Sequence, residues 1–225
     1  MNVLDLAIWH ALKGRQSNFA QGSELALRFD PAISVFAAIK QNDEASLNAL
    51  ADLVPEQASI VLLQPDIVPT PKNCQETFTG HGFQMVLTAE TGLRPEVDFV
   101  ELGAADAPEI LALAELTKPG PFLLGTPKLG GFVGIRREGR LAAMAGERIK
   151  PSGYAEISGV CTHPDFRGQG FAGTLSSTVA RRILQRGETP FLHVISNNTS
   201  ATTLYEKLGF EKRCEVHVKA LKRKD

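Results

Sequence analysis

The sequence predicts an α+β fold built in two halves. In the second half, three apolar segments separated by glycine-containing turns indicate consecutive antiparallel strands. A glycine-rich loop then opens an amphipathic helix, and another apolar segment follows that helix. The first half alternates strand-like segments with a single clear helix. We place the boundary near residue 96, with an α/β accessory domain over residues 1–96 and a second domain over residues 97–225.

The first half is predicted to contain strands around a helix. Its residues 4–12 place apolar side chains at the spacing of one helix face. Pro65, Pro69 and Pro71 interrupt regular structure, so residues 64–80 are expected to form a loop. Strands are expected at residues 24–29, 33–39 and 59–63, a helix at about 42–53, and a strand-like segment at 83–88.

The second half has clearer element boundaries. Asp106 precedes Pro108 at the start of a helix that should run to about Thr117, because aspartate favours the N-cap and proline the first turn. The helix after the glycine-rich loop repeats apolar residues at spacings of three and four, and Gly187 can end it. Strands are expected at residues 98–102, 131–135, 141–149, 155–162 and 190–195, a short helix at 201–208, and one or two strands from there to about 221.

Composition and charge exclude several classes of protein. The 225 residues are 43% hydrophobic and 22% charged, which is ordinary for a soluble protein. A formal net charge of -1 argues against a protein that binds nucleic acid through its phosphates. The sequence contains no apolar run near the roughly 18 to 20 residues of a membrane span. We therefore expect small-molecule partners, without nucleic acid or membrane.

The cysteines indicate a reducing compartment. Cys74, Cys161 and Cys214 are odd in number and lack C-x-x-C spacing, which argues against a disulfide framework and a zinc site. No cluster of His, Asp, Glu and Cys has metal-ligand spacing, so we expect no metal. Asp5 stands where a signal peptide would carry cationic residues. The expected location is the cytoplasm.

The segment RGQGFAG, residues 167–173, contains a G-x-G-x-x-G and suggests a phosphate-binding loop. A P-loop needs lysine and then Ser or Thr after its second glycine, and here Gly170 is followed by Phe171. A dinucleotide-binding loop wants an acidic residue at the end of the next strand to hold the ribose, and Glu188 precedes that strand instead. A nucleoside triphosphate and a dinucleotide are therefore both disfavoured as the ligand of this loop.

The general physics of the loop still fits a site for a diphosphate. Glycines at 168 and 170 leave backbone N–H groups uncovered at the start of a helix, which makes a concave positive site. Arg167 adds charge beside it. The alternative is that the glycines merely make a tight strand-to-helix turn.

Two motifs carry a resemblance to a known family. Residues 160–172, VCTHPDFRGQGFA, resemble the acetyl-CoA signature of the GNAT superfamily of N-acetyltransferases, in which a strand and polar turn precede R/Q-x-x-G-x-G/A. Residues 198–210, NTSATTLYEKLGF, resemble the family's N-x-x-A-x-x-L-Y-x-x-L-G-F block. The likeness covers about residues 98–225 and implies a mixed, mostly antiparallel sheet flanked by helices. The element order of the first half is compatible with a degenerate copy of that fold.

The resemblance also implies a set of cofactor contacts. In the family, the main chain of the strand before the loop pairs with the pantetheine arm, and the pyrophosphate lies on the loop amides. Asn198 would bond the arm from the far side, act as the N-cap of the short helix, or do both. The cofactor-binding residues expected on this basis are Val160, Cys161, Thr162, Arg167, Gly168, Gln169, Gly170, Phe171, Ala172, Asn198 and Tyr205.

Tyr205 is the candidate catalytic acid. Acyl transfer to an amine expels a thiolate, and the resemblance implies that the phenol donates a proton to the sulfur as the bond breaks. The alternative is a core tyrosine, because Ala201, Leu204 and Leu208 share its helix face. Cys161 has no base or cation among its neighbours, so we expect direct transfer without an acyl-enzyme.

The attacking amine needs a proton acceptor, because an alkyl ammonium has a pKa of about 10. Glu156 is the first candidate for the general base and Glu147 the second. Both lie in predicted strands. The alternative for each is a solvated strand carboxylate, with the proton passing along water.

The sequence therefore predicts an acetyl-CoA-dependent N-acetyltransferase that moves an acyl group directly from the CoA thioester to a primary amine, on a small molecule or a peptide. The alternatives are a CoA-binding or acyl-CoA-sensing module without turnover and a nicotinamide-dependent enzyme. The chain is expected to be a monomer or homodimer. The loop at residues 118–131 and the first half are expected to shape the acceptor site.

Overall fold

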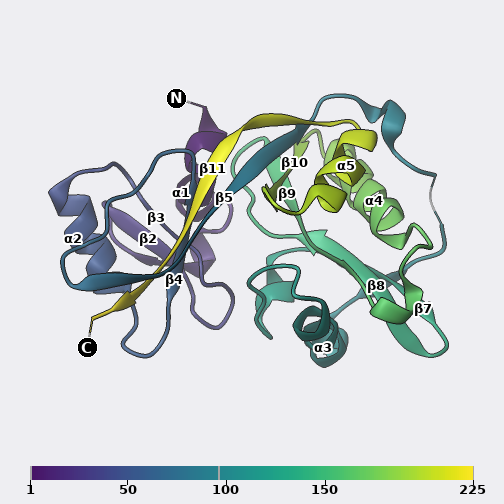
Figure 1. Ribbon diagram of the computed structural model, residues 1–225, viewed down its shortest axis with the longest axis horizontal. Coiled ribbons are helices and arrows are strands. Elements are labelled where there is room, and N and C mark those ends of the chain that lie inside the picture. The colour runs from purple at the N-terminus through teal and green to yellow at the C-terminus, as the bar shows by residue number, and fades with distance from the viewer. Residues whose placement is uncertain (1, 96, 225) are drawn as a thin grey trace.

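A computed structural model describes residues 2–95 and 97–224, which form two β-sheets flanked by helices (Figure 1). The larger sheet has eight strands in the order β4-β11-β5-β10-β9-β8-β7-β6, and the smaller has the order β1-β2-β3. Within the larger sheet, β9 and β10 are parallel and the other described ladders are antiparallel. The predicted α+β fold, with a mixed, mostly antiparallel sheet, is confirmed.

The first half supplies the small sheet and two strands of the large one. The predicted loop at residues 64–80 is wrong from Cys74 onward, because β5 begins there and pairs along its length with β11. Pairing with a distant strand outweighs the turn-forming composition of this segment. The elements are α1 (Ala7–Lys13), β1 (Ala20–Gly22), β2 (Ala26–Phe29), β3 (Ala37–Ile39), α2 (Glu44–Leu53), β4 (Ile60–Gln64) and β5 (Cys74–Leu87).

The second half follows the predicted order of elements. Its meander of antiparallel strands turns from β7 to β8 through Glu138 and Gly139, whose φ angles of 52° and 74° make a tight left-handed turn. The elements are β6 (Val100–Leu102), α3 (Ala107–Thr117), β7 (Phe132–Arg137), β8 (Arg140–Glu147), β9 (Tyr154–Thr162), α4 (Phe171–Gln185), β10 (Thr189–Ile195), α5 (Thr199–Lys207) and β11 (Phe210–Arg223).

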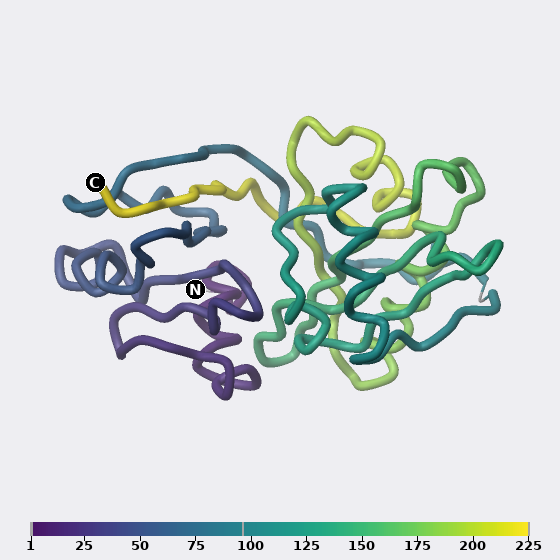
Figure 2. Tube along the Cα trace, turned by 90° about the horizontal axis from the view of Figure 1, so that it is seen from below, coloured from purple at the N-terminus to yellow at the C-terminus, as the bar shows by residue number. Residues whose placement is uncertain are grey.

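Strands of the two halves alternate in the part of the large sheet that runs from its β4 edge to β10. β11, near the end of the chain, lies between β4 and β5, and β5 lies between β11 and β10. Figure 2 shows the C-terminal strand, in yellow, returning to the lobe that the first residues build. The large sheet therefore contains strands from both sides of the predicted boundary at residue 96. The division into two domains at that residue stays a prediction.

Helices cover both faces of the sheet. α4 and α5 pack on one face over a core that contains Leu175, Leu192 and Phe210. α3 packs on the other face, in a cluster with Phe132 and Met144. These layers place the start of α4 beside the end of β9, where the predicted site residues gather (Figure 1).

The glycine that ends α5 is predicted to be a sensitive point of the fold. Gly209 has a φ of 95°, and a Cβ there would lie 1.9 Å from the carbonyl oxygen of Ala89. Gly209→Ala should lower the free energy of unfolding by about 3 kcal/mol or more, through the left-handed φ and the steric overlap together.

Gly139→Ala is the matched control, because Gly139 also has a positive φ of 74° but a Cβ there meets nothing within 4 Å. It should lose only about 1 kcal/mol. Urea unfolding of both variants measures the difference. Equal losses would contradict the steric explanation.

Candidate active site

The site begins where two parallel strands separate. The β9–β10 ladder consists of the pairs Tyr154–Thr189, Ala155–Pro190 and Glu156–Phe191, although β9 continues to Thr162 and β10 to Ile195. Gly159 has a φ of 65°, and the β8–β9 register shifts between Met144 and Gly146, which are features of a bulge that bends β9. The edge of β9 that faces β10 thus has unpaired backbone groups beyond Glu156 among the described residues.

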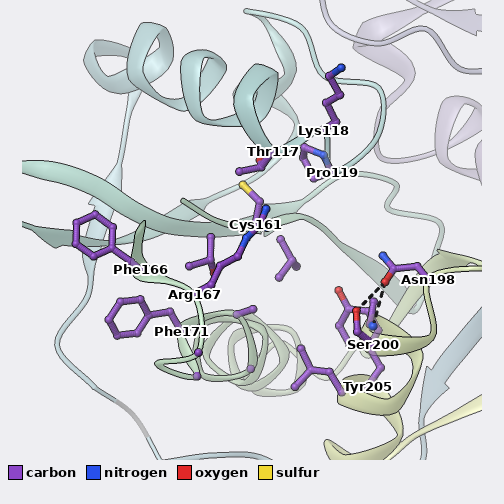
Figure 3. Close-up of a pocket in the computed structure, with 18 of the residues that line it drawn as sticks. Thr117, Lys118, Pro119, Cys161, Phe166, Arg167, Phe171, Asn198, Ser200 and Tyr205 are labelled. Atoms are coloured by element: carbon purple, nitrogen blue, oxygen red, sulfur yellow. Dashed lines mark hydrogen bonds between the residues drawn. The ribbon is translucent and has the colours of Figure 1, made fainter. Parts of the chain in front are cut away.

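A cavity of about 520 Å³ lies at this separation, bounded by β9, the glycine-rich loop, α4 and α5. Figure 3 shows Thr117, Lys118 and Pro119 on the α3 side of Cys161, and Asn198, Ser200 and Tyr205 around α5. Gln169 is exposed and lies outside the lining. The other predicted cofactor residues all line the cavity: Val160, Cys161, Thr162, Arg167, Gly168, Gly170, Phe171, Ala172, Asn198 and Tyr205.

The loop has the backbone geometry of an anion site. Gly168 and Gly170 have φ angles of 80° and 79°, which residues with a side chain rarely adopt, and Gly170 is the N-cap of α4. Such left-handed residues turn successive N–H groups toward one side. The positive end of the α4 dipole lies at the same place. The loop and the cavity together can therefore hold a negatively charged group.

Arg94 is a residue of the site that sequence reasoning missed. Its Nη1 donates to the carbonyl oxygen of Gly170 at 3.1 Å, and it lines the cavity. A Cβ at Gly173 would lie 2.7 Å from the guanidinium carbon of Arg94, so this glycine makes room for the arginine. The main chain of Arg94 is held by Ser177 at 3.0 Å and by Arg181. A second guanidinium thus lies beside the loop. Gly173 leaves room for a close neighbour, but the local sequence does not identify Arg94 as that neighbour.

Asn198 both caps α5 and lines the cavity. Its Oδ1 accepts from the backbone N–H of Ala201 at 3.2 Å and from Ser200 Oγ at 3.1 Å (Figure 3). The predicted N-cap is confirmed by this geometry. The side-chain NH₂ group retains donors that the cap does not use.

Tyr205 is packed and also reaches the cavity. Its ring lies edge-on to Phe210 at 5.9 Å between centroids, and 8% of the residue is exposed. Burial, with the negative charge of Glu156 as a further cause, raises the pKa of Tyr205 to about 12. The phenol therefore keeps its proton at neutral pH and can act as a donor.

Glu156 lies outside the cavity, at the point where β9 and β10 separate. It is fully buried, and its oxygens accept from Arg148 Nε at 2.9 Å, Arg148 Nη2 at 2.7 Å and His193 Nδ1 at 2.8 Å. Burial acts to raise the pKa of Glu156, but Arg148 and His193 outweigh it and lower the pKa to about 2. So weak a base, with its oxygens occupied, is suited to holding the strands together.

Glu147 is likewise engaged elsewhere. It is 4% exposed, and its Oε2 accepts from Lys150 Nζ at 2.9 Å and Arg186 Nη2 at 3.0 Å. Among the described residues that line the cavity, none is aspartate, glutamate or histidine. The two predicted base candidates are thus not brought to the cavity.

Three features bear on other chemistry. Burial raises the pKa of Cys161 to about 11, which leaves this thiol protonated and unreactive at neutral pH. Over residues 2–95 and 97–224, groups of three or more His, Cys, Asp or Glu that could hold a metal are absent. The same residues include no helix with the length and apolar content of a membrane span.

The cluster of Glu156, Arg148 and His193 is predicted to stabilise the fold in a pH-dependent way. Glu156→Gln leaves the Arg148 charge buried without its partner, which should cost about 3–5 kcal/mol at pH 7. Because folding lowers the pKa of Glu156 from 4.5 to about 2, the ionised carboxylate stabilises the fold above about pH 4.5, and this contribution is lost as pH falls toward 2.

Urea unfolding between pH 7 and pH 3 measures this effect. The difference between wild type and Glu156→Gln should shrink as the pH falls. Glu44→Gln, which removes a surface ion pair with Lys72, should change stability by less than about 1 kcal/mol. A Glu156→Gln variant as stable as wild type at pH 7 would contradict the proposal that Glu156 holds β9 and β10 together.

The chain is similar in sequence and fold to known acetyltransferases. Residues 132–218 match the family described as FR47-like protein. An acetyltransferase of Yersinia enterocolitica is 32% identical over 119 residues, which are 52% of this chain and 67% of that protein. A crystal structure of a GNAT-family acetyltransferase from Novosphingobium aromaticivorans covers 100% of both chains at 39% identity, with a TM-score of 0.92.

A GCN5-related N-acetyltransferase from Kribbella flavida shares the fold, with a TM-score of 0.67 at 18% identity over 100% of this chain and 97% of that one. The relatives from Yersinia and Novosphingobium exceed 30% identity over most or all of their own length. The chain therefore belongs to the GNAT family and is an acetyltransferase.

Proposed function

We propose that the protein is an acetyl-CoA-dependent N-acetyltransferase that moves the acetyl group directly from the thioester to a primary amine. The observation that carries this proposal is the cavity at the β9–β10 separation, which joins a diphosphate-type loop to a buried phenol. A cofactor with a diphosphate at one end and a thioester at the other matches that combination.

The cofactor would be held along its length. Its diphosphate would lie on the amides of residues 168–172, with Arg167 and Arg94 adding positive charge. The amides of its pantetheine arm would pair with the edge of β9 that β10 leaves open, as an added strand does. The side-chain NH₂ group of Asn198 would donate from the opposite wall.

The chemistry requires one proton to be given and one to be taken. The neutral amine attacks the thioester carbon, and collapse of the tetrahedral intermediate breaks the C–S bond. Tyr205, protonated because its pKa is about 12, donates to the departing thiolate and is then reprotonated from solvent. With Glu156 and Glu147 engaged in ion pairs away from the cavity, water would accept the proton of the amine.

A CoA-binding module without turnover is the second candidate. The absence of a carboxylate or imidazole from the described cavity lining favours it, because general-base catalysis then depends on water. Release of free CoA in the presence of an amine separates the two functions.

The first half is proposed to be an accessory domain and a degenerate copy of the same fold. Its elements follow in the order meander β1–β3, helix α2 and strand β4, which matches the order of meander, α4 and β10 in the second half. Phe36, just before β3, and Val61, in β4, form one parallel bridge. At the position of the phosphate loop, however, Asp43 caps α2 and Glu44 follows it. These carboxylates would repel a diphosphate. Cofactor binding is thus assigned to the second half.

The function is tested by mixing the protein with acetyl-CoA and a panel of primary amines and measuring released thiol. Thiol release that depends on the amine, together with an acetylated amine found by mass spectrometry, is expected. A protein that binds CoA with micromolar affinity but releases no thiol with any amine would favour the module without turnover.

Tyr205→Phe tests the acid. Because the phenylalanine keeps the ring that packs on Phe210, the variant should fold normally while kcat falls by about 10²-fold or more. The dissociation constant for acetyl-CoA should change by less than about threefold, since the hydroxyl acts only on the departing sulfur. Losses of equal size in kcat and acetyl-CoA affinity would assign Tyr205 to packing.

A further inference from the structure

A second cavity, of about 100 Å³, lies between the two halves of the molecule. Its wall is formed by β4, β11 and β10 and by the loop that follows α3. The lining is mostly apolar and includes Phe36, Val61, Leu63, Ile195, Val216 and Val218. Arg148 and His193 are its charged or titratable members.

This cavity adjoins the proposed cofactor cavity at the strand separation. Pro119 lines both of them. Val160, Cys161 and Thr162 of β9 face the cofactor cavity, whereas His193, Val194 and Ile195 of the diverging part of β10 face the second one. A group in the second cavity would therefore lie next to the end of the pantetheine arm, where the thioester is expected.

Arg148 Nε and Nη2 and both ring nitrogens of His193, which line the second cavity, already have hydrogen-bond partners behind it. Gln84 Oε1 accepts from Arg213 Nη1 at 2.8 Å, which identifies its Nε2 as the donor to His193 Nε2 at 3.1 Å. His193 Nδ1 then donates to Glu156 at 2.8 Å. Glu156 and Arg148 neutralise each other. A charged group on a ligand here would lose water without gaining an unpaired counter-charge, since Arg148 is already paired with Glu156.

We propose that the second cavity binds the hydrocarbon group of the acceptor, and that the acceptor is a primary amine with a compact, uncharged apolar group. This inference rests on the proposed N-acetyltransferase activity. A dry apolar cavity of about 150 Å³ holds a benzene molecule, so the smaller one here suits a branched alkyl group of roughly three to five carbons. Its amino group would extend past Pro119 toward the thioester.

Three amines of similar length test the substrate class. With saturating acetyl-CoA, kcat/KM for 3-methylbutylamine should exceed that for 4-aminobutanoate, whose far carboxylate would enter the cavity, and for 1,4-diaminobutane, whose far ammonium would enter it, by about 10-fold or more. A higher value for 4-aminobutanoate or for 1,4-diaminobutane would overturn the inference while leaving the acetyltransferase activity intact. If no amine is acetylated, the proposed function fails and the inference fails with it.

Leu63→Trp tests the cavity itself by filling it. The variant should lower kcat/KM for 3-methylbutylamine at least 10-fold but affect methylamine, which has no group to place there, by less than threefold. Ile67→Trp is the matched control, because Ile67 is 64% exposed in the same half and outside this cavity, and it should behave as wild type.

Leu63→Ala provides a second variant that does not depend on fitting a larger side chain. Enlarging the cavity should shift the preference from 3-methylbutylamine toward 2-phenylethylamine by about 10-fold. Thermal unfolding and the dissociation constant for CoA establish that each variant is folded. Equal effects of Leu63→Trp on methylamine and 3-methylbutylamine, with no shift in Leu63→Ala, would overturn the assignment.

Discussion

The separation of β9 from β10 is the constraint on which the rest of the site depends. Two parallel strands that stay paired would use their backbone groups on each other and leave no opening in the sheet. Here the ladder ends at Glu156 and Phe191, and the bulge near Gly159 bends β9 while β10 remains paired with β5. The ion-paired carboxylate of Glu156 bonds His193 of β10 at this point. We interpret the cluster of Glu156, Arg148 and His193 as the contact that fixes where the two strands separate. The same ion pair and hydrogen bonds lower the pKa of Glu156, which explains why this carboxylate is a poor base.

The exchange of strands gives the first half a direct part in that geometry. β5 comes from the first half, yet it pairs with β10 on one side and β11 on the other. Without β5, β10 would be an edge strand and nothing would keep it straight as β9 bends away. The first half also contributes Phe36, Val61 and Leu63 to the cavity beside the strand separation. It therefore supports the proposed cofactor site and, on our proposal, shapes the acceptor site.

Sequence reasoning succeeded where local backbone physics decides the outcome. The glycine loop, the helix after it and the Asn198 cap depend on φ angles and N–H groups within a few residues, and these were predicted in place. It failed where a distant partner decides. Residues 74–80 resemble a loop until β11 pairs with them, Arg94 joins the site only because a connecting segment crosses α4, and the burial of Glu156 depends on Arg148 and His193. None of these partners is visible in the local pattern.

The central claim is that the cofactor lies in the separation between β9 and β10, with its diphosphate at the head of α4 and its sulfur beside Tyr205. A crystal structure of the protein with acetyl-CoA tests this most directly. We expect the pantetheine amides to hydrogen-bond the backbone of residues 157–162, and the Tyr205 hydroxyl to lie within about 3.5 Å of the sulfur. A bound cofactor that leaves the α4 head empty, or a phenol turned away from the sulfur, would contradict the account.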